Sequence, residues 1–135
     1  MRIGGHNVIA IAAAAIAFWI VGSIWFGLVF GEMWRTANGW TMDDFANDNP
    51  AWMALGALAA ILSAIGLSIA LRWGGLPDLP GAIKRTLWLW LGFGLTCALY
   101  PLAYELDHSV VLFALTAGYL LIGWLIMAAI LASLK

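Results

Sequence analysis

Four long stretches of the sequence contain no charged residue. They cover residues 7–30, 51–71, 86–104 and 109–134, and each is close to the roughly 20 residues that an α-helix needs to cross the hydrocarbon core of a bilayer. The few charged residues gather between these stretches. The sequence therefore predicts an all-α integral membrane protein with four transmembrane helices, which form one domain over residues 1–135 as two antiparallel hairpins.

The composition excludes an ordinary soluble domain. Charged residues make up 10% of the chain and hydrophobic residues 64%, whereas soluble domains carry about 25% charged residues. So few charges cannot cover a surface in contact with water. Cys97 is the only cysteine, so no disulfide can form within the chain, and we expect it to serve as a small packing residue.

A cleaved signal peptide is the alternative interpretation of the first stretch. Arg2 is a basic start, and the alanines at positions 13–15 resemble a cleavage site. The apolar run continues to Phe30, however, which is longer than the apolar region of a signal peptide. We therefore expect a retained transmembrane helix.

The basic residues fall on alternate sides of the predicted helices. Arg35 stands alone on one side, and the other side holds Arg2, Arg72, Lys84, Arg85 and Lys135. Because basic residues are enriched in cytoplasmic loops, we expect both termini and the loop over residues 72–85 in the cytoplasm. Loops 31–50 and 105–108 are then on the outer side. We expect Arg72, Lys84 and Arg85 to contact anionic lipid headgroups.

Small residues recur every four positions on several predicted helices. Such spacing places them on one face, where a second helix can approach closely in lipid. The first helix, capped by Asn7, carries Ser23, Gly27 and Gly31 on one face and Gly22, Trp25 and Phe26 beside it. The others carry Gly56, Ala60, Ala64 and Ser68, then Gly92 with Thr96, and Ala114 with Gly118. We interpret these faces as helix contacts.

The first outer loop is acidic and rich in aromatic residues, which are Trp34, Trp40, Phe45 and Trp52. Thr41 and Asp44 are spaced as in a capping box, which predicts a short amphipathic helix from Met42 to Asn47. Tryptophan is enriched at the headgroup level of membranes. We therefore favour interfacial anchoring by these aromatic residues over a ligand cage.

Groups that could perform chemistry are scarce. No ionisable residue except Cys97 and the tyrosines lies within a predicted span, and such groups mark proton and ion paths in transporters. His6 and His108 fall on opposite sides of the predicted membrane, so they cannot hold one haem or metal together. Glu105 lies near Tyr100, Tyr104 and Asp107, where we favour helix capping over cation binding. We expect no catalytic, cofactor or metal site and no nucleic-acid partner.

Two groups of residues resemble a known family. The first group is Asn7, Gly22, Trp25, Phe26, Phe30, Gly31 and Trp34; the second is Trp90, Leu91, Gly92, Phe93, Thr96, Glu105, Ala117, Gly118 and Tyr119. They resemble the signature of small bacterial membrane proteins catalogued as domain of unknown function 1761. Gly27 and Leu28 stand where a Ser-Pro pair is expected, and Leu120 stands where a histidine often follows. The resemblance implies a four-helix domain of the bacterial inner membrane and no established activity.

Three functional hypotheses remain open. We favour a non-catalytic structural or interaction protein, either a homo-oligomer or an accessory subunit of a larger membrane complex. The alternative is a channel or carrier for a small neutral solute, lined by hydroxyl groups. Those hydroxyls belong to Ser23, Ser63, Ser68, Thr96 and Thr116. An enzyme acting on lipid through Glu105 and His108 ranks third, because only one weak acid–base pair is available.

Overall fold

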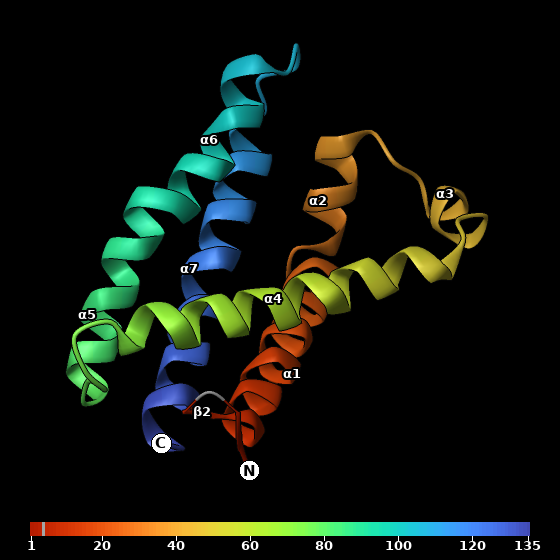
Figure 1. The fold of residues 1–135 in the computed structure, drawn as a ribbon. Helices are drawn as coiled ribbons and strands as arrows, with labels where there is room; N and C mark the ends of the chain where they lie inside the picture. The colour runs from red at the N-terminus through yellow and green to blue at the C-terminus, as the bar shows by residue number, and fades with distance from the viewer. Residues whose placement is uncertain (4) are drawn as a thin grey trace.

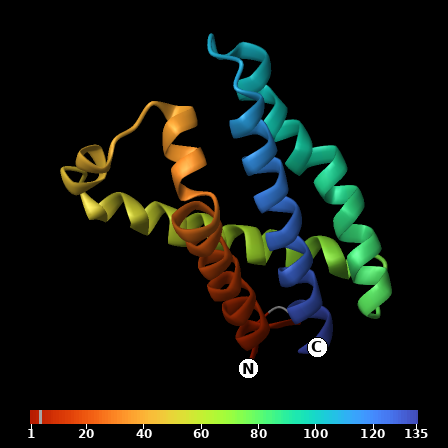
Figure 2. The ribbon, with the colours of Figure 1, turned by 180° about the vertical axis from the view of Figure 1, so that it is seen from behind.

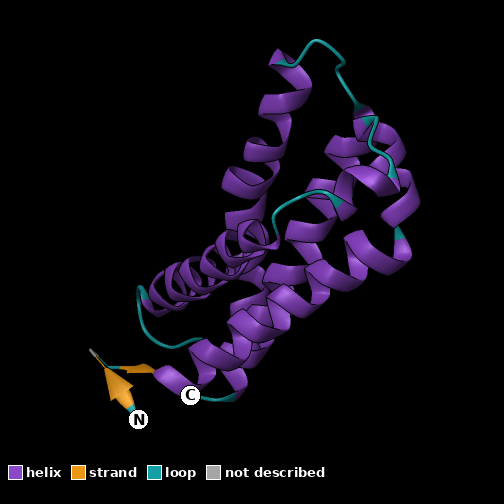
Figure 3. Cartoon of the chain, turned by 90° about the vertical axis from the view of Figure 1, so that its right-hand side faces the viewer, coloured by secondary structure: helices purple, strands orange, loops and turns teal. Residues whose placement is uncertain are grey.

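A computed structural model describes residues 1–3 and 5–135. Four helical segments are long and apolar enough to cross a membrane: Val8–Val29, Pro50–Arg72, Leu79–Tyr104 and Val110–Ser133. The predicted four-span, all-α fold is therefore confirmed. Two short strands precede the first helix: β1 (Arg2–Ile3) pairs with β2 (His6–Asn7) in the antiparallel direction (Figure 3).

The last helix forms the centre of the molecule. Helix α7 (Val110–Ser133) contacts α1 (Val8–Ile24) on one side and α5 (Leu79–Leu89) with α6 (Leu95–Tyr104) on the other (Figure 1). Helix α4 (Met53–Arg72) crosses α1 and α7 obliquely, in front of them in Figure 1 and behind them in Figure 2. The arrangement as two antiparallel hairpins thus stays a prediction. Both termini lie at one end, and we call the opposite end the distal end.

The first span ends at Val29, close to the predicted end at Phe30. A π-helical turn, η1 (Trp25–Val29), follows α1, and Phe30 closes this wide turn by donating its N–H to the Trp25 carbonyl at 2.9 Å. The chain then resumes as α2 (Gly31–Asn38), which ends at Gly39 with φ 72°. Glycine adopts this left-handed conformation without strain. The segment over residues 31–50 therefore begins with a helix that the sequence pattern did not predict.

The short helix of this loop is present. Helix α3 (Met42–Ala46) begins at Thr41, whose hydroxyl accepts from the N–H of Asp44 at 3.4 Å, and the Asp44 carboxylate accepts from the N–H of Thr41 at 2.6 Å. This confirms the predicted capping box, while the amphipathic character of α3 stays a prediction. A 3₁₀ turn, η2 (Pro50–Trp52), then leads into α4.

The third span begins earlier than the predicted Thr86. Helix α5 starts at Leu79 because the Asp78 carboxylate accepts from the N–H of Gly81 at 3.0 Å, and a proline stands in the first turn. Proline is favoured there because its missing N–H needs no partner. A second π-helical turn, η3 (Trp90–Gly94), joins α5 to α6.

Arg85 has a structural role that the sequence did not predict. Its guanidinium donates to the carbonyls of Leu71, Trp73 and Gly75 at 2.6, 3.2 and 3.0 Å. These carbonyls lie at the C-terminal end of α4, where helical partners are missing. Arg85 therefore caps α4, and its contact with lipid headgroups stays a prediction.

The predicted ladder of small residues on α4 lies inside the protomer. Ala60 and Ala64 are 2% and 0% exposed in the core that also holds Ala10 and Ala14 of α1. Gly56 continues the ladder, and a Cβ there would lie 3.8 Å from Nε1 of Trp19. This face brings α1 and α4 together and is not free for another protein.

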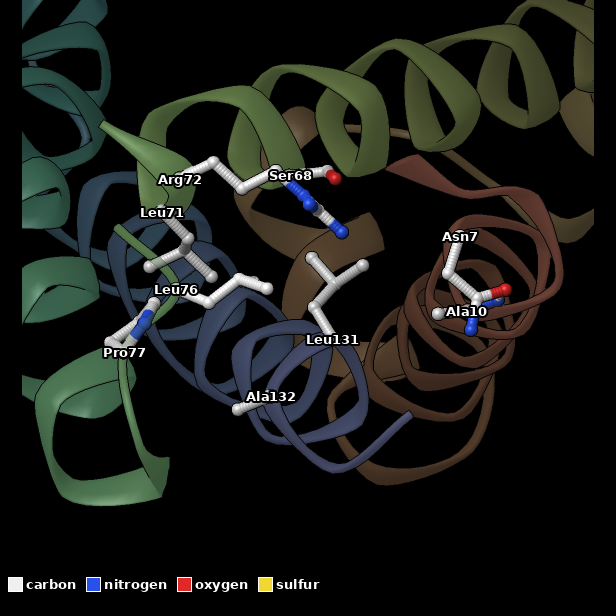
Figure 4. A pocket seen from close by; sticks show the side chains of 9 residues that line it. All are labelled: Asn7, Ala10, Ser68, Leu71, Arg72, Leu76, Pro77, Leu131 and Ala132. Carbon is white, nitrogen blue, oxygen red and sulfur yellow. Dashed lines mark hydrogen bonds between the residues drawn. The ribbon is translucent and has the colours of Figure 1, made fainter. Parts of the chain in front are cut away.

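Hydrogen bonds hold the terminal end together, beside the small pocket shown in Figure 4. Asn7 caps α1 as predicted, accepting from the N–H groups of Ile9 and Ala10 at 3.1 and 3.3 Å, and it also donates to the carbonyl of Leu134 after α7. His6 pairs with the Ser68 hydroxyl of α4 at 2.9 Å. The void between Asn7, Ser68 and Arg72 measures only about 10 Å³, roughly the space of one water molecule.

Candidate functional site

The two groups of family residues meet at the junction of η1 and α7. The indole N–H of Trp25 donates to the carbonyl of Leu115 at 3.1 Å. Gly118 lies one helical turn further on, and a Cβ there would lie 3.1 Å from the ring of Trp25. The glycine therefore makes room for the indole, which explains the pairing of these residue types in distant parts of the chain.

Tyr119 occupies the same junction. Its ring stacks on Phe18 with centroids 4.8 Å apart and meets Phe26 edge-on at 5.2 Å. Its hydroxyl donates to the carbonyl of Phe18 at 3.3 Å. A Cβ on Gly22 would lie 2.8 Å from this hydroxyl. Gly22, Phe26 and Tyr119 thus form one close contact between α1–η1 and α7.

The third span repeats the arrangement of the first. Trp90 is the first residue of η3, as Trp25 is of η1, and its indole N–H donates to the carbonyl of Ala117 at 2.9 Å. Both π turns therefore fix a tryptophan to α7, at Leu115 and Ala117. Trp25 and Trp90 also each have a glycine two residues later in the sequence. π-Helical turns occur often at functional sites.

A polar cavity lies next to this junction, toward the distal end. It measures about 210 Å³, and its polar or reactive lining consists of Trp34 and Asn38 of α2, Cys97 of α6, Glu105, Ser109 and Thr116. Pro101 lacks an N–H and so cannot donate to the carbonyl of Cys97. The hydroxyl of nearby Thr96 donates to the carbonyl of Gly92 at 2.8 Å instead.

Glu105 lines this cavity and does not cap the next helix. The N-terminal cap of α7 is Ser109, whose hydroxyl accepts from the N–H of Leu112 at 3.2 Å. The expectation that Glu105 acts as a cap is therefore wrong. Carboxylate, hydroxyl and amide oxygens around a cavity of this size can hold water or a small polar molecule.

The remaining predicted residues fall into two sets. Phe30 contacts Trp25, with ring centroids 4.6 Å apart, and Gly31 is buried against the carbonyl of Phe26. The exposed set comprises Ser23, Gly27, Gly92, Phe93 and Thr96. The residues described by the structure contain no group of three metal-binding side chains. His108 pairs with the carbonyl of Leu102 at 2.7 Å.

A family model described as Protein of unknown function (DUF1761) matches residues 9–132. The chain belongs to this family. No curated protein and no solved structure matches it. The match confirms the resemblance, and Gly22, Trp25, Gly118 and Tyr119 of this DUF1761 chain fit together where α1 and η1 meet α7.

The departures from the expected signature lie in contrasting places. Gly27 of this DUF1761 protein is exposed, and nothing lies within 4 Å of a Cβ placed on it. Leu120 is half-buried against the core.

Proposed function

We propose that this protein is a non-catalytic membrane protein that acts by associating side by side with other helices, as a homo-oligomer or as an accessory subunit. One observation carries the proposal. The polar groups of its signature residues Trp25, Trp90 and Tyr119 donate to backbone carbonyls inside the protomer. Groups used in this way hold helices together and leave little for catalysis.

A face of η3 and α6 supports association. Gly92 and Thr96 are exposed four residues apart, and nothing lies within 4 Å of a Cβ placed on Gly92. Exposed small residues at this spacing let helices approach closely in lipid. The α4 ladder is already occupied within the protomer, so the Gly92–Thr96 face is the favoured contact.

We propose the bacterial inner membrane as the location, with both termini in the cytoplasm. The basic residues favour this orientation. The position of both termini at one end of the molecule is compatible with it (Figure 1). Reporter fusions at each terminus and in the loop after α6 test the orientation directly.

Cysteine cross-linking tests the association. In a Cys97→Ala background, Thr96→Cys places a thiol on the proposed contact face, and Ile16→Cys places one on α1 at a residue that is 58% exposed. We expect a bismaleimide to cross-link the first variant in native membranes and to leave the second uncross-linked. Mass spectrometry of the product distinguishes a second copy from a foreign subunit. Equal yields for both variants contradict the proposal.

A carrier or channel for a small neutral solute is the second candidate. The polar cavity beside Glu105 favours it, because the side chains of Glu105 and Thr116 offer hydrogen-bonding groups there. Ser23, Ser68 and Thr96 are less suited, since each is already hydrogen-bonded elsewhere. Flux into liposomes that falls in Thr116→Val, but not in Ser23→Ala, supports this candidate.

A further inference from the structure

Three aromatic rings surround a pocket beside the distal part of α2. The ring of Trp34 lies 5.2 Å from that of Trp40 and 5.9 Å from that of Phe45, and the latter two are 5.8 Å apart, between centroids. The pocket measures about 490 Å³ and is lined by Trp34, Trp40, Asp44, Phe45, Asn47 and Asp48. We call it the aromatic pocket.

The aromatic rings are not closed off by their mutual contacts. Trp40 remains 43% exposed and Phe45 40% exposed. A stable packing cluster would cover these rings more fully. Their free surfaces therefore remain available to a molecule that enters the pocket.

Two carboxylates line the same pocket, and each is held in place by hydrogen bonds that only one of its two oxygens accepts. Oδ2 of Asp44 accepts from the N–H and the hydroxyl of Thr41 at 2.6 and 2.9 Å. Oδ1 of Asp48 accepts from the N–H of Asn49 at 2.9 Å. The second oxygen of each carboxylate has no such bond among the described residues. Both groups can therefore face a positively charged ligand while staying fixed.

The lining carries negative charge, while Arg35 lines the adjoining pocket that shares Asp48 with it. Asp44 and Asp48 are the charged members of the aromatic pocket's lining, and no lysine or arginine belongs to that lining. The backbone N–H of Thr41, followed by its hydroxyl, lowers the pKa of Asp44, so this carboxylate stays ionised at neutral pH. An ion that enters the pocket must be a cation.

The aromatic walls decide which kind of cation fits. A compact metal ion requires several oxygen ligands, and the described residues hold no cluster of three metal-binding side chains. An ammonium group that carries alkyl substituents instead lies against aromatic faces, which attract it through cation–π interactions. Carboxylates beside those faces add charge attraction. Methyl-rich ammonium ligands suit both features.

We propose that the aromatic pocket binds an alkylammonium group. Trp34, Trp40 and Phe45 supply the aromatic faces, and Asp44 and Asp48 supply the charge. Two sources provide the same chemistry: a small soluble quaternary amine and the choline headgroup of a lipid. Anchoring of the aromatic rings in the headgroup region, without a ligand, is the competing explanation.

Calorimetric titration of the full chain in an uncharged maltoside detergent tests the proposal. The titrants are tetramethylammonium chloride and a short-chain phosphatidylcholine, with sodium chloride as the blank. We expect saturable binding of at least one ammonium compound. Binding of both identifies the ammonium group as the ligand, and binding of phosphatidylcholine alone identifies a lipid headgroup as its source.

Matched variants connect the signal to the pocket. We expect Trp40→Leu and Asp48→Asn each to weaken binding about fivefold, the effect of about 1 kcal/mol from one lost contact. Asp43→Asn and Trp52→Leu change the same residue types outside the lining and should bind as the unaltered protein does. Circular dichroism confirms that each variant is folded.

Three results would overturn the proposal. The first is that neither ammonium compound binds more than sodium chloride does. The second is that Trp40→Leu and Asp48→Asn bind with unchanged affinity. The third is that the two control variants lose affinity as much as the pocket variants do, because the binding would then be a general property of the surface.

Discussion

At the scale of single residues, the glycines of this protein have different roles, which depend on the atoms that surround each of them. A Cβ on Gly123 would lie 2.5 Å from the ring of Phe18, whereas nothing lies within 4 Å of a Cβ on Gly66. The first glycine permits the closest contact between α1 and α7, and the second faces open space. The sequence does not distinguish them, because both stand in apolar helices.

This contrast predicts opposite effects of one substitution. Gly123→Ala should destabilise the protein by about 1–3 kcal/mol, because the added methyl group forces Phe18 or the helices apart. Gly66→Ala should be neutral or stabilising by up to about 1 kcal/mol, because alanine favours a helix. Reversible unfolding in detergent with increasing dodecyl sulfate measures both. Equal effects of the two substitutions would contradict the packing described for Gly123.

The structure of the aromatic pocket should depend on pH through Asp44. Hydrogen bonds from Thr41 lower the pKa of the Asp44 carboxyl below the ordinary 3.8. A carboxyl with a lowered folded pKa stabilises the folded state above its unfolded pKa, and this contribution disappears as the pH falls through the folded pKa. We expect the near-ultraviolet circular dichroism of the aromatic pocket to change below about pH 4. In Thr41→Ala, the change should begin at a higher pH.

At the scale of elements, the two π turns place a tryptophan against the same helix. Because η1 and η3 both begin at a tryptophan that donates to α7, the wide turns act as a matched pair of attachments. The sequence predicted the helices that contain them but not the turns. A π turn inserts one residue without changing composition, so an apolar stretch carries no signal for it.

Removal of the indole donors tests this element. Trp25→Phe and Trp90→Phe should each destabilise the protein by about 0.5–1.5 kcal/mol, the usual value of a neutral hydrogen bond. Trp88→Phe is the control, because Trp88 is 66% exposed on the same span as Trp90. Unfolding in detergent measures all three, and equal loss in Trp88→Phe would refute the attachment role.

The start of α5 depends on the N-terminal cap at Asp78. Asp78→Ala removes the acceptor for the N–H of Gly81 and should cost about 1 kcal/mol. Asp43→Ala serves as the control, because Asp43 is not the cap residue of α3. Amide hydrogen exchange over residues 79–85 should accelerate in the first variant only. Unchanged exchange would show that Asp78 does not hold the start of α5.

At the scale of the whole molecule, part of the fold could be predicted from sequence. Uncharged stretches located the four spans, and local signals located the caps at Asn7 and Thr41. The early start of α5 was also readable from Asp78 and Pro80, but the apolar stretch that begins at Thr86 obscured it. The crossing of α4 and the meeting of Trp25 with Gly118 were not readable, because helices that are apolar on every side do not reveal which face is buried.

The candidate site could likewise be predicted only in part. The signature residues could be named from sequence, and their common purpose became visible only when Trp25, Gly118 and Tyr119 met in space. The polar cavity at Glu105 required α2, α6 and α7 together, so no local pattern marked it. The cavity forms only through contacts between distant segments, and one of these segments, α2, was not predicted.

The free face of η3 and α6 makes a prediction for the whole molecule. Gly92→Leu should prevent close approach of a second helix and reduce association at least tenfold, an effect of about 1.4 kcal/mol. Gly66→Leu is the matched control, because Gly66 is also a glycine with open space around it and lies outside the faces of small residues. Energy transfer between labelled chains in liposomes measures the association. Equal loss in both variants would point to another face.

Lateral association is best tested by native mass spectrometry of the protein, extracted gently from its own membranes. We expect an assembly that contains more than one chain, either copies of this protein or a foreign subunit in fixed stoichiometry, and Gly92→Leu should reduce it. A single chain with no protein partner, at native expression level, would refute lateral association.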